Sequence, residues 1–249
     1  RIVRAWRLKR GSGWGGGHHA LSSAQEKSMN SNNHAWKIVH LMRHGEGEHN
    51  AACDIAGDED LYEDERYFDA GLTNDGKEQA RDAGIQLQGS KLDAVVASPL
   101  SRALQTAMIA YRAWKDHSQP TLSDPRFVCV EWCREGMTYG VHPCNRRRAI
   151  SEVKSEFPQF DFSHIATDED EIWRRDGSES QQDLNHRVSL FLEWLENLEA
   201  KHVLVCTHCV FLHALFANFV REQDNAVNSW FGRGELRSFV FEFQKSESP

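Results

Sequence analysis

The residues Arg43, His44 and Gly45 directly follow a mostly apolar run, Ile38 to Met42. Arginine presents a rigid fork of donors that fits phosphate oxygens, and imidazole is a good nucleophile near neutral pH, where much of it is unprotonated. The glycine lets the backbone come close to a ligand. Because ligands bind at strand ends in open α/β sheets, this triplet predicts phosphoryl transfer through a phosphohistidine.

A triplet of this kind recurs by chance, so the wider pattern decides what it means. Segment 41–50 adds Glu46, His49 and Asn50 to the triplet. Three more motifs follow in order: AGLTNDGKEQA at 70–80, SPLSRALQTA at 98–107 and VCTH at 205–208. This order of motifs resembles the histidine phosphatase superfamily, also called the phosphoglycerate mutase-like family. The resemblance covers most of residues 36–243.

The resemblance implies roles for particular side chains. The matching histidine becomes phosphorylated in that family, which makes His44 the expected nucleophile. Arg43 and Arg102 are expected to hold the phosphoryl group, because fixed cations around its oxygens lower the barrier. His208 is expected to face His44 across the phosphate and to stabilise the transition state. Asn50 matches a family position whose polar side chain contacts the phosphate. Thr207 and Glu46 either line the same pocket or serve as capping or surface residues.

A general acid must protonate the leaving alkoxide and then take a proton from water. The resembled family places a carboxylate after its third strand, where this chain has Glu131 and Glu135. The sequence Arg134-Glu135-Gly136 resembles the family pattern better, so Glu135 is the expected acid and Glu131 is the fallback. Neither a metal nor another cofactor is expected, because arginines and histidines supply the positive charge.

The stretch after the expected acid favours hydrolysis. Phosphoglycerate mutases usually carry an Arg-His-Tyr-Gly-type stretch and further basic residues there, whereas this chain reads GMTYGVHPC at 136–144. The run HPCNRRR at 142–148 resembles instead a fungal and plant branch whose members look like broad-range phosphatases. The expected function is therefore hydrolysis of a small phosphorylated metabolite. Mutase-type phosphoryl transfer and a non-catalytic phosphate-binding scaffold remain alternatives.

The three arginines of that run have two possible roles. Arg146, with Arg147 and Arg148, either contacts a second anionic group of the substrate or pairs on a helix surface with the acids at 168–171. The sequence favours neither role over the other.

Cys209 departs from the resembled family, which usually has glycine after its second histidine. A side chain there would crowd the phosphate or tilt the loop. Cys209 also forms a C-x-x-C with Cys206, a spacing found in redox dithiols and in half of some metal sites. Cys129 and Cys133 would complete such a metal site, but this alternative leaves the phosphate-binding motifs unexplained.

Alternating strands and helices predict an α/β fold with three layers, in which helices cover both faces of a mostly parallel sheet. The expected strands are 37–42, 92–98, 127–130, 202–207 and 238–243, the last at an edge and the one candidate for antiparallel pairing. The expected helices are 74–88, 102–114, 182–198 and 210–220, with Thr73 as an N-cap. Residues 136–180 are expected to form an insertion over the open end of the sheet.

The 249 residues suit one large domain. A net charge of -8 argues against nucleic acid as a partner, and a mean hydropathy of -0.61 argues against a membrane protein. Six cysteines are too few for a disulfide scaffold and fit reduced thiols in an intracellular, cytoplasmic protein. The oligomeric state does not follow from the sequence.

Residues 1–34 are expected to lie outside the folded domain, which would span 35–249. The first 25 residues contain no acid. Their arginines and lysine lie in the first ten residues, and a glycine-rich run follows this basic stretch at 11–17. Such an end suits an organelle transit segment, an expression remnant or a translated upstream region. It is expected to be disordered or loosely docked.

Overall fold

The computed structural model describes residues 2–8, 35–119, 122–175, 177, 179–222 and 230–243. A mixed sheet of seven strands, in the order β4-β3-β5-β2-β7-β1-β6, forms its centre. The strands are β1 (Val3–Arg7), β2 (Ala35–Arg43), β3 (Ala94–Ala97), β4 (Arg126–Cys129), β5 (His202–Thr207), β6 (Val220–Glu222) and β7 (Leu236–Phe243). β7 runs antiparallel to its neighbours β2 and β1, and the other neighbouring strands pair in parallel.

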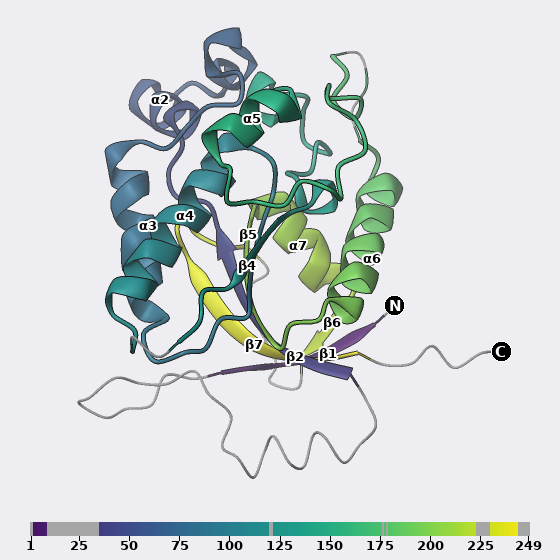
Figure 1. The fold of residues 1–249 in the computed structure, drawn as a ribbon. Helices are drawn as coiled ribbons and strands as arrows, with labels where there is room; N and C mark the ends of the chain where they lie inside the picture. Colours follow the sequence, from purple (N-terminus) through teal and green to yellow (C-terminus); the bar gives the residue numbers. More distant parts are fainter. Residues whose placement is uncertain are drawn as a thin grey trace, which may run out of the picture.

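Helices cover both faces of this sheet, which confirms the expected three layers. The α-helices are α2 (Glu48–Ala56), α3 (Asn74–Gln86), α4 (Ser101–Asp116), α5 (Ile150–Glu156), α6 (Gln181–Asn197) and α7 (Cys209–Asn218). Short 3-10 helices are η1 (Glu59–Glu63), η2 (Glu65–Tyr67), η3 (Glu131–Cys133) and η4 (Pro143–Asn145). In Figure 1, α3 and α4 lie on one side of the sheet, α6 and α7 on the other, and α2 and α5 beyond one end.

The core consists of two apolar clusters, one on each face. Because successive side chains of a strand point to opposite faces, β2 supplies Val39 and Leu41 to the cluster under α6 and α7, and Met42 to the cluster under α3 and α4. Helix α6 packs on its face of the sheet through a stripe of buried side chains, Leu184, Val188, Phe191, Leu192 and Leu195. Thr73 caps α3 as predicted, since its hydroxyl accepts from the Gly76 amide at 3.0 Å.

The position of β7 and the role of the N-terminal residues differ from expectation. The prediction of an edge strand at 238–243 is wrong in its position, because β1 pairs along β7 on the side away from β2. Residues 3–7 were expected outside the domain, yet Val3 and Ala5 are fully buried in the sheet. The remainder of the expectation, for residues 9–34, concerns a segment outside the described residues.

Among the described residues of segment 136–180, the helices are η4 and α5, and the rest is irregular chain with isolated β-bridges. It lies over the carboxyl ends of the strands, where α5 is seen in Figure 1. Buried Arg134 helps to hold it there, since its guanidinium pairs with Glu131 and with Asp170 at 2.7 Å each. Within the part of the chain that the structure describes, no helix is both long and apolar enough to cross a membrane.

Candidate active site

The candidate site lies where neighbouring parallel strands end. β2 and β5 pair in register, with Arg43 opposite Thr207, so the loops that follow these strands emerge side by side. The His44 amide donates to the Thr207 carbonyl at 2.9 Å and extends this pairing by one bond. Arg102 comes from the first turn of α4, after β3. Glu135 follows η3, after β4, so four strand ends contribute to one site.

His44 is buried, and its two ring nitrogens have different partners. Nδ1 lies 2.7 Å from the Gly45 carbonyl, which only accepts, so Nδ1 carries the proton. Nε2 therefore presents a lone pair, which accepts from Arg102 Nε at 3.2 Å. Burial, together with the nearby Arg102 and Arg43, holds the pKa of His44 well below its ordinary value. The imidazole is thus neutral and has its lone pair on Nε2.

Two arginines surround this ring. The guanidinium of Arg102 is buried and also donates to the Cys144 carbonyl and to Asn145 Oδ1. Arg43 donates through Nη1 to the Phe231 carbonyl at 2.8 Å, while its buried Nε has no hydrogen-bond partner among the described residues. An unpaired donor in a buried position is costly, so this nitrogen favours an anionic oxygen as a ligand.

His208 directly precedes α7 and lies next to His44, with ring centroids 5.0 Å apart. Its Nε2 is 2.8 Å from Ser98 Oγ, and its buried Nδ1 has no partner in the described chain. Burial, Arg102 and His44 hold the pKa of His208 well below its ordinary value. The ring lies against His44 rather than in the wall of the open cavity.

Glu135 reaches the first turn of α7. Its Oε1 accepts from the amides of Gly136, Val210 and Phe211 at 2.9, 3.0 and 3.3 Å, while Oε2 has no partner in the described part of the chain. Burial raises the pKa of Glu135, although Arg102 opposes the shift. One carboxylate oxygen therefore fixes the side chain to the helix, and the other remains available for proton transfer.

These groups border an open cavity of about 200 Å³ whose lining includes Arg43, His44, Arg102 and Glu135. Asn50 lies in the same wall and holds the turn before α2, because its Oδ1 accepts from the Gly47 amide at 3.1 Å. The lining also contains residues to which the sequence analysis gave no role: His49, Tyr62, Tyr139, His142 and Cys144. His49 belongs to the first motif, and the others lie in stretches without helical or strand periodicity.

The structure places Thr207, Glu46 and Glu131 away from the cavity. The hydroxyl of Thr207 donates to the Cys133 carbonyl at 2.6 Å. Glu46 accepts from Thr73 Oγ1 at 2.8 Å and from Arg233 at 3.2 Å, so it fixes loops together. Glu131 pairs with two buried arginines beside the insertion.

The three arginines of 146–148 also have protein partners. Arg146 pairs with Glu65 at 3.0 Å and lies over the rings of Phe68 and Trp173. Arg147 is buried and binds Glu131 together with three carbonyls at 167–169. Arg148 pairs with Asp69 and Glu156. The acids at 168–171 were the alternative partners for these arginine side chains. Among them, Asp170 pairs with the side chain of Arg134 and accepts from the backbone amide of Arg147.

The four cysteines of the alternative metal or redox site lie in different places. Cys129 and Cys206 pack in the cluster under α3 and α4, and Cys133 packs in the cluster on the other face. Cys209 lines the active-site cavity, with its Sγ 3.7 Å from the Phe231 carbonyl. Among the described residues no group of three His, Cys, Asp or Glu side chains is arranged for a metal ion.

Comparison with known proteins found plant and fungal proteins of similar sequence. A "Phosphoglycerate mutase-like protein" of Arabidopsis thaliana is 34% identical over 214 residues, which cover 76% of this chain and 77% of that protein. A "Phosphomutase-like protein 3" of Candida albicans is 27% identical over 194 residues, 72% of this chain and 58% of that protein.

The fold also has a solved counterpart. The crystal structure of the ecdysone phosphate phosphatase from Bombix mori, in complex with tungstate, matches with a TM-score of 0.53 at 15% identity. The match covers 79% of this chain and 85% of that one and shows that the fold is shared. A family model described as the histidine phosphatase superfamily (branch 1) matches residues 39–246. The chain belongs to the histidine phosphatase superfamily.

Proposed function

We propose that this protein is a phosphomonoester hydrolase that works through a phosphohistidine at His44. The observation that carries the proposal is the neutral, buried imidazole of His44, whose Nε2 lone pair lies 3.2 Å from Arg102 Nε. The unpartnered Nε of Arg43 adds a second donor for the phosphoryl oxygens. Membership of the superfamily supports phosphatase or phosphomutase-like chemistry.

In the first step the phosphoryl oxygens bind between Arg43 and Arg102. Arg102 Nε then donates to a phosphoryl oxygen instead of His44 Nε2, which frees the lone pair of that nitrogen for in-line attack on phosphorus. The bond from phosphorus to the leaving oxygen breaks, and Glu135 donates its proton to that oxygen. Arg43 and Arg102 stabilise the charge that spreads over the phosphoryl oxygens. The Nδ1 of His208, which is unpaired in the described part of the chain and whose ring lies beside His44, is a further donor for the phosphoryl group as it transfers to His44.

In the second step Glu135, now ionised, accepts a proton from water. The water oxygen attacks phosphorus, the P–N bond breaks, and its electron pair returns to Nε2 of His44. Glu135 ends protonated, so the enzyme is restored. The sum of the two steps is one ester and one water converted to one alcohol and inorganic phosphate.

The cations of the cavity favour hydrolysis over mutase-type transfer. A mutase must retain its dephosphorylated intermediate so that a second hydroxyl can take the phosphoryl group. Of the described residues, the arginines in the cavity wall are Arg43 and Arg102, which both belong to the phosphoryl site. The arginines at 146–148 have carboxylate and carbonyl partners instead. The names of the plant and fungal relatives make phosphoglycerate mutase-type transfer the second candidate.

The test combines turnover with detection of the intermediate. Purified protein is mixed with p-nitrophenyl phosphate, quenched, kept at alkaline pH to preserve a phosphoramidate, and analysed by peptide mass spectrometry. We expect phosphate release and a phosphate adduct on His44, both lost in His44→Asn. The matched control is His186→Asn, an exposed histidine on α6, which should keep both.

Two results would contradict the proposal. Turnover without an adduct, and with full activity in His44→Asn, would exclude the phosphohistidine. Phosphate exchange between the hydroxyls of phosphoglycerate, faster than release of inorganic phosphate, would establish the mutase instead; phosphorus NMR separates the two products.

A further inference from the structure

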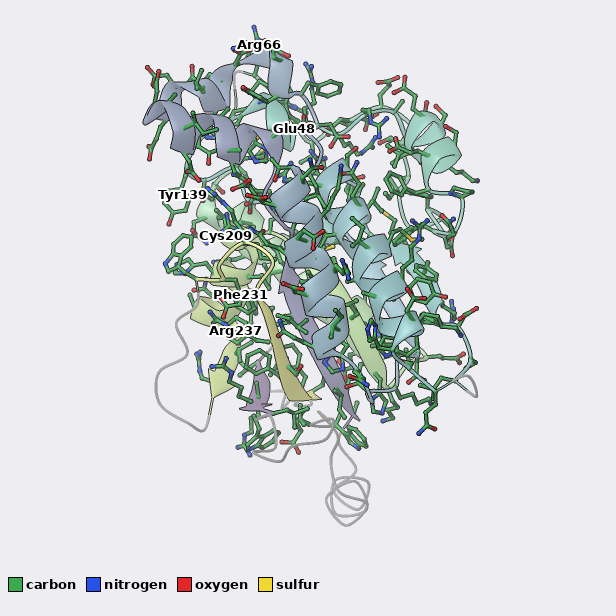
Figure 2. The ribbon with its side chains drawn as sticks, turned by 90° about the vertical axis from the view of Figure 1, so that its left-hand side faces the viewer. Glu48, Arg66, Tyr139, Cys209, Phe231 and Arg237 are labelled. Atoms are coloured by element: carbon green, nitrogen blue, oxygen red, sulfur yellow. The ribbon has the colours of Figure 1, made fainter. Side chains whose placement is uncertain are left out.

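The mouth of the active-site cavity is aromatic. Tyr139 lines the cavity although 69% of its surface is exposed, and its ring centroid lies 6.2 Å from that of Trp230, which is 41% exposed. Large exposed apolar side chains are few in the described chain, so a pair of them at one opening is informative. Figure 2 shows Tyr139 and Cys209, both cavity residues, close together on one side of the molecule.

The ring of Trp230 is held in place by its surroundings. Trp230 stacks on His213 of α7, with centroids 4.1 Å apart and an interplanar angle of 15°. The Trp230 carbonyl also accepts from Arg237 at 2.8 Å. Tyr139 precedes Gly140, whose φ of +153° and close approach to the His142 ring exclude a side chain. A ring fixed in the way of Trp230 loses little conformational freedom when a flat group stacks on it.

The deeper wall is also aromatic and carries no charge at neutral pH. The rings of His49, Tyr62 and His142 follow one another, with successive centroids 5.7 and 5.3 Å apart. Burial lowers the pKa of His142, and it holds the pKa of His49 well below the ordinary histidine value. The positive charge of the cavity is therefore concentrated at the phosphoryl site.

We infer that the preferred substrates are phosphomonoesters whose alcohol portion carries an aromatic or similarly flat apolar group and no second anion. This inference rests on the proposed function. The phosphoryl group occupies the site between Arg43 and Arg102, and the flat group stacks on Tyr139 and Trp230. A second phosphate or a carboxylate would meet neutral rings in place of a cation, and its desolvation would not be compensated.

The test uses two esters with the same kind of leaving alkoxide, 2-phenylethyl phosphate and ethyl phosphate. Chemistry at phosphorus is then matched, and only the remote ring differs. We expect kcat/KM to be about tenfold or more higher for the phenyl compound, which is the size of a good aromatic contact. Tyr139→Ala and Trp230→Ala should each lower this ratio severalfold, mainly through KM, and Tyr139→Phe should keep it.

The control and the remaining outcomes separate the inference from the proposed function. Ile2→Ala, at an exposed apolar residue next to β1, should leave the ratio unchanged. Equal kcat/KM for the two esters would overturn the inference while hydrolysis still stood. Faster turnover of 3-phosphoglycerate than of 2-phenylethyl phosphate would overturn it as well.

If neither ester were turned over, binding would decide. Calorimetry with 3-phenylpropylphosphonate and propylphosphonate measures the same preference without chemistry. A preference for the phenyl compound that disappears in Tyr139→Ala would support the aromatic rim even though the proposed hydrolysis had failed. Equal affinities would overturn the inference.

Discussion

Two ionisable side chains in the cavity wall have pKa values shifted in opposite directions. Burial lowers the pKa of His44 below 6.5 and raises the pKa of Glu135 above 4.5. The proposed first step needs neutral His44 and protonated Glu135. Activity therefore rises with pH through the lowered histidine pKa and falls with pH through the raised carboxyl pKa, and the two shifts widen the range in which both forms coexist.

The pH dependence of kcat/KM tests this pairing, because it reports the free enzyme. We expect a bell-shaped profile whose acid limb lies below pH 6.5 and whose alkaline limb lies above pH 4.5. Glu135→Gln should lose the alkaline limb. Substrate ionisation is the same for both proteins, so the ratio of the two profiles isolates Glu135. If the alkaline limb survived in Glu135→Gln, a group other than Glu135 would be responsible for that limb.

The role of Glu135 as an acid predicts a dependence on the leaving group. We expect Glu135→Gln to reduce kcat/KM for 2-phenylethyl phosphate by about 10²- to 10⁴-fold, because the alkoxide needs a proton when the phosphohistidine forms. For p-nitrophenyl phosphate the loss in kcat/KM should be much smaller, because p-nitrophenolate leaves without a proton. The value of kcat should fall for both substrates, because hydrolysis of the phosphohistidine loses the base that accepts a proton from water. The amide oxygen of glutamine still accepts from the three backbone amides, so the start of α7 is retained. Equal losses of kcat/KM for the two substrates would contradict the acid role.

The sequence located the residues that directly follow strands and did less well elsewhere. His44, His208 and Arg102 come together because parallel strands place their carboxyl ends at one edge of the sheet. Thr207 was placed in the pocket, but the alternation of β5 points it to the face of Val203 and Val205. The direction of the Thr207 side chain could therefore have been predicted from the sequence. The position of Tyr139 at the cavity could not, since no periodicity marks the chain around it.

At the scale of elements, the insertion depends on buried ion pairs. The side chain of Arg147 is 1% exposed and binds Glu131 and backbone carbonyls, whereas that of Arg146 is 32% exposed. We expect Arg147→Ala to lower the free energy of unfolding by about 3–5 kcal/mol, because Glu131 loses one of its two arginine partners and the carbonyls at 167–169 lose their donor. Arg146→Ala should cost about 1 kcal/mol or less. Urea unfolding measures both, and equal losses would contradict this account.

Long periodic elements were predictable and short irregular ones were not. The apolar stripe of α6 predicted helix 182–198, within one residue of the observed bounds. β1 has a matching signal, because buried Val3 and Ala5 alternate with exposed Arg4 and half-buried Trp6. The basic charge of this segment instead favoured a loose terminus. Pairing with β7, far along the chain, is a tertiary contact that five residues alone do not specify.

For the whole molecule, the completeness of the sheet can be tested at β1. Val3 is fully buried beside β6 and β7. We expect Val3→Ala to lower the free energy of unfolding by about 2 kcal/mol through lost burial and the cavity left behind. Arg7→Ala, at an exposed position of the same strand, should change it by about 0.5 kcal/mol or less. Equally small changes would show that β1 contributes little to the sheet.

The buried histidines connect the active site to the stability of the whole domain. His44, His49 and His208 have pKa values well below 6.5, so below pH 6.5 the unfolded chain binds protons that the folded chain does not. Stability therefore falls as pH falls from 6.5, by up to about 1.4 kcal/mol per pH unit for each histidine. Glu135 and Asp69 act oppositely, because burial raises their pKa values and their folded forms retain protons.

Removing one histidine isolates its share of this dependence. We expect the slope of unfolding free energy against pH, measured by urea unfolding between pH 6.5 and 5 with tryptophan fluorescence, to be smaller in His49→Asn by about 1.4 kcal/mol per pH unit. Substituting exposed His186 should leave the slope unchanged. An unchanged slope in His49→Asn would mean that the folded protein protonates this ring. The cluster would then carry more positive charge in acid, and the neutral ring assumed for His44 would no longer follow from burial alone.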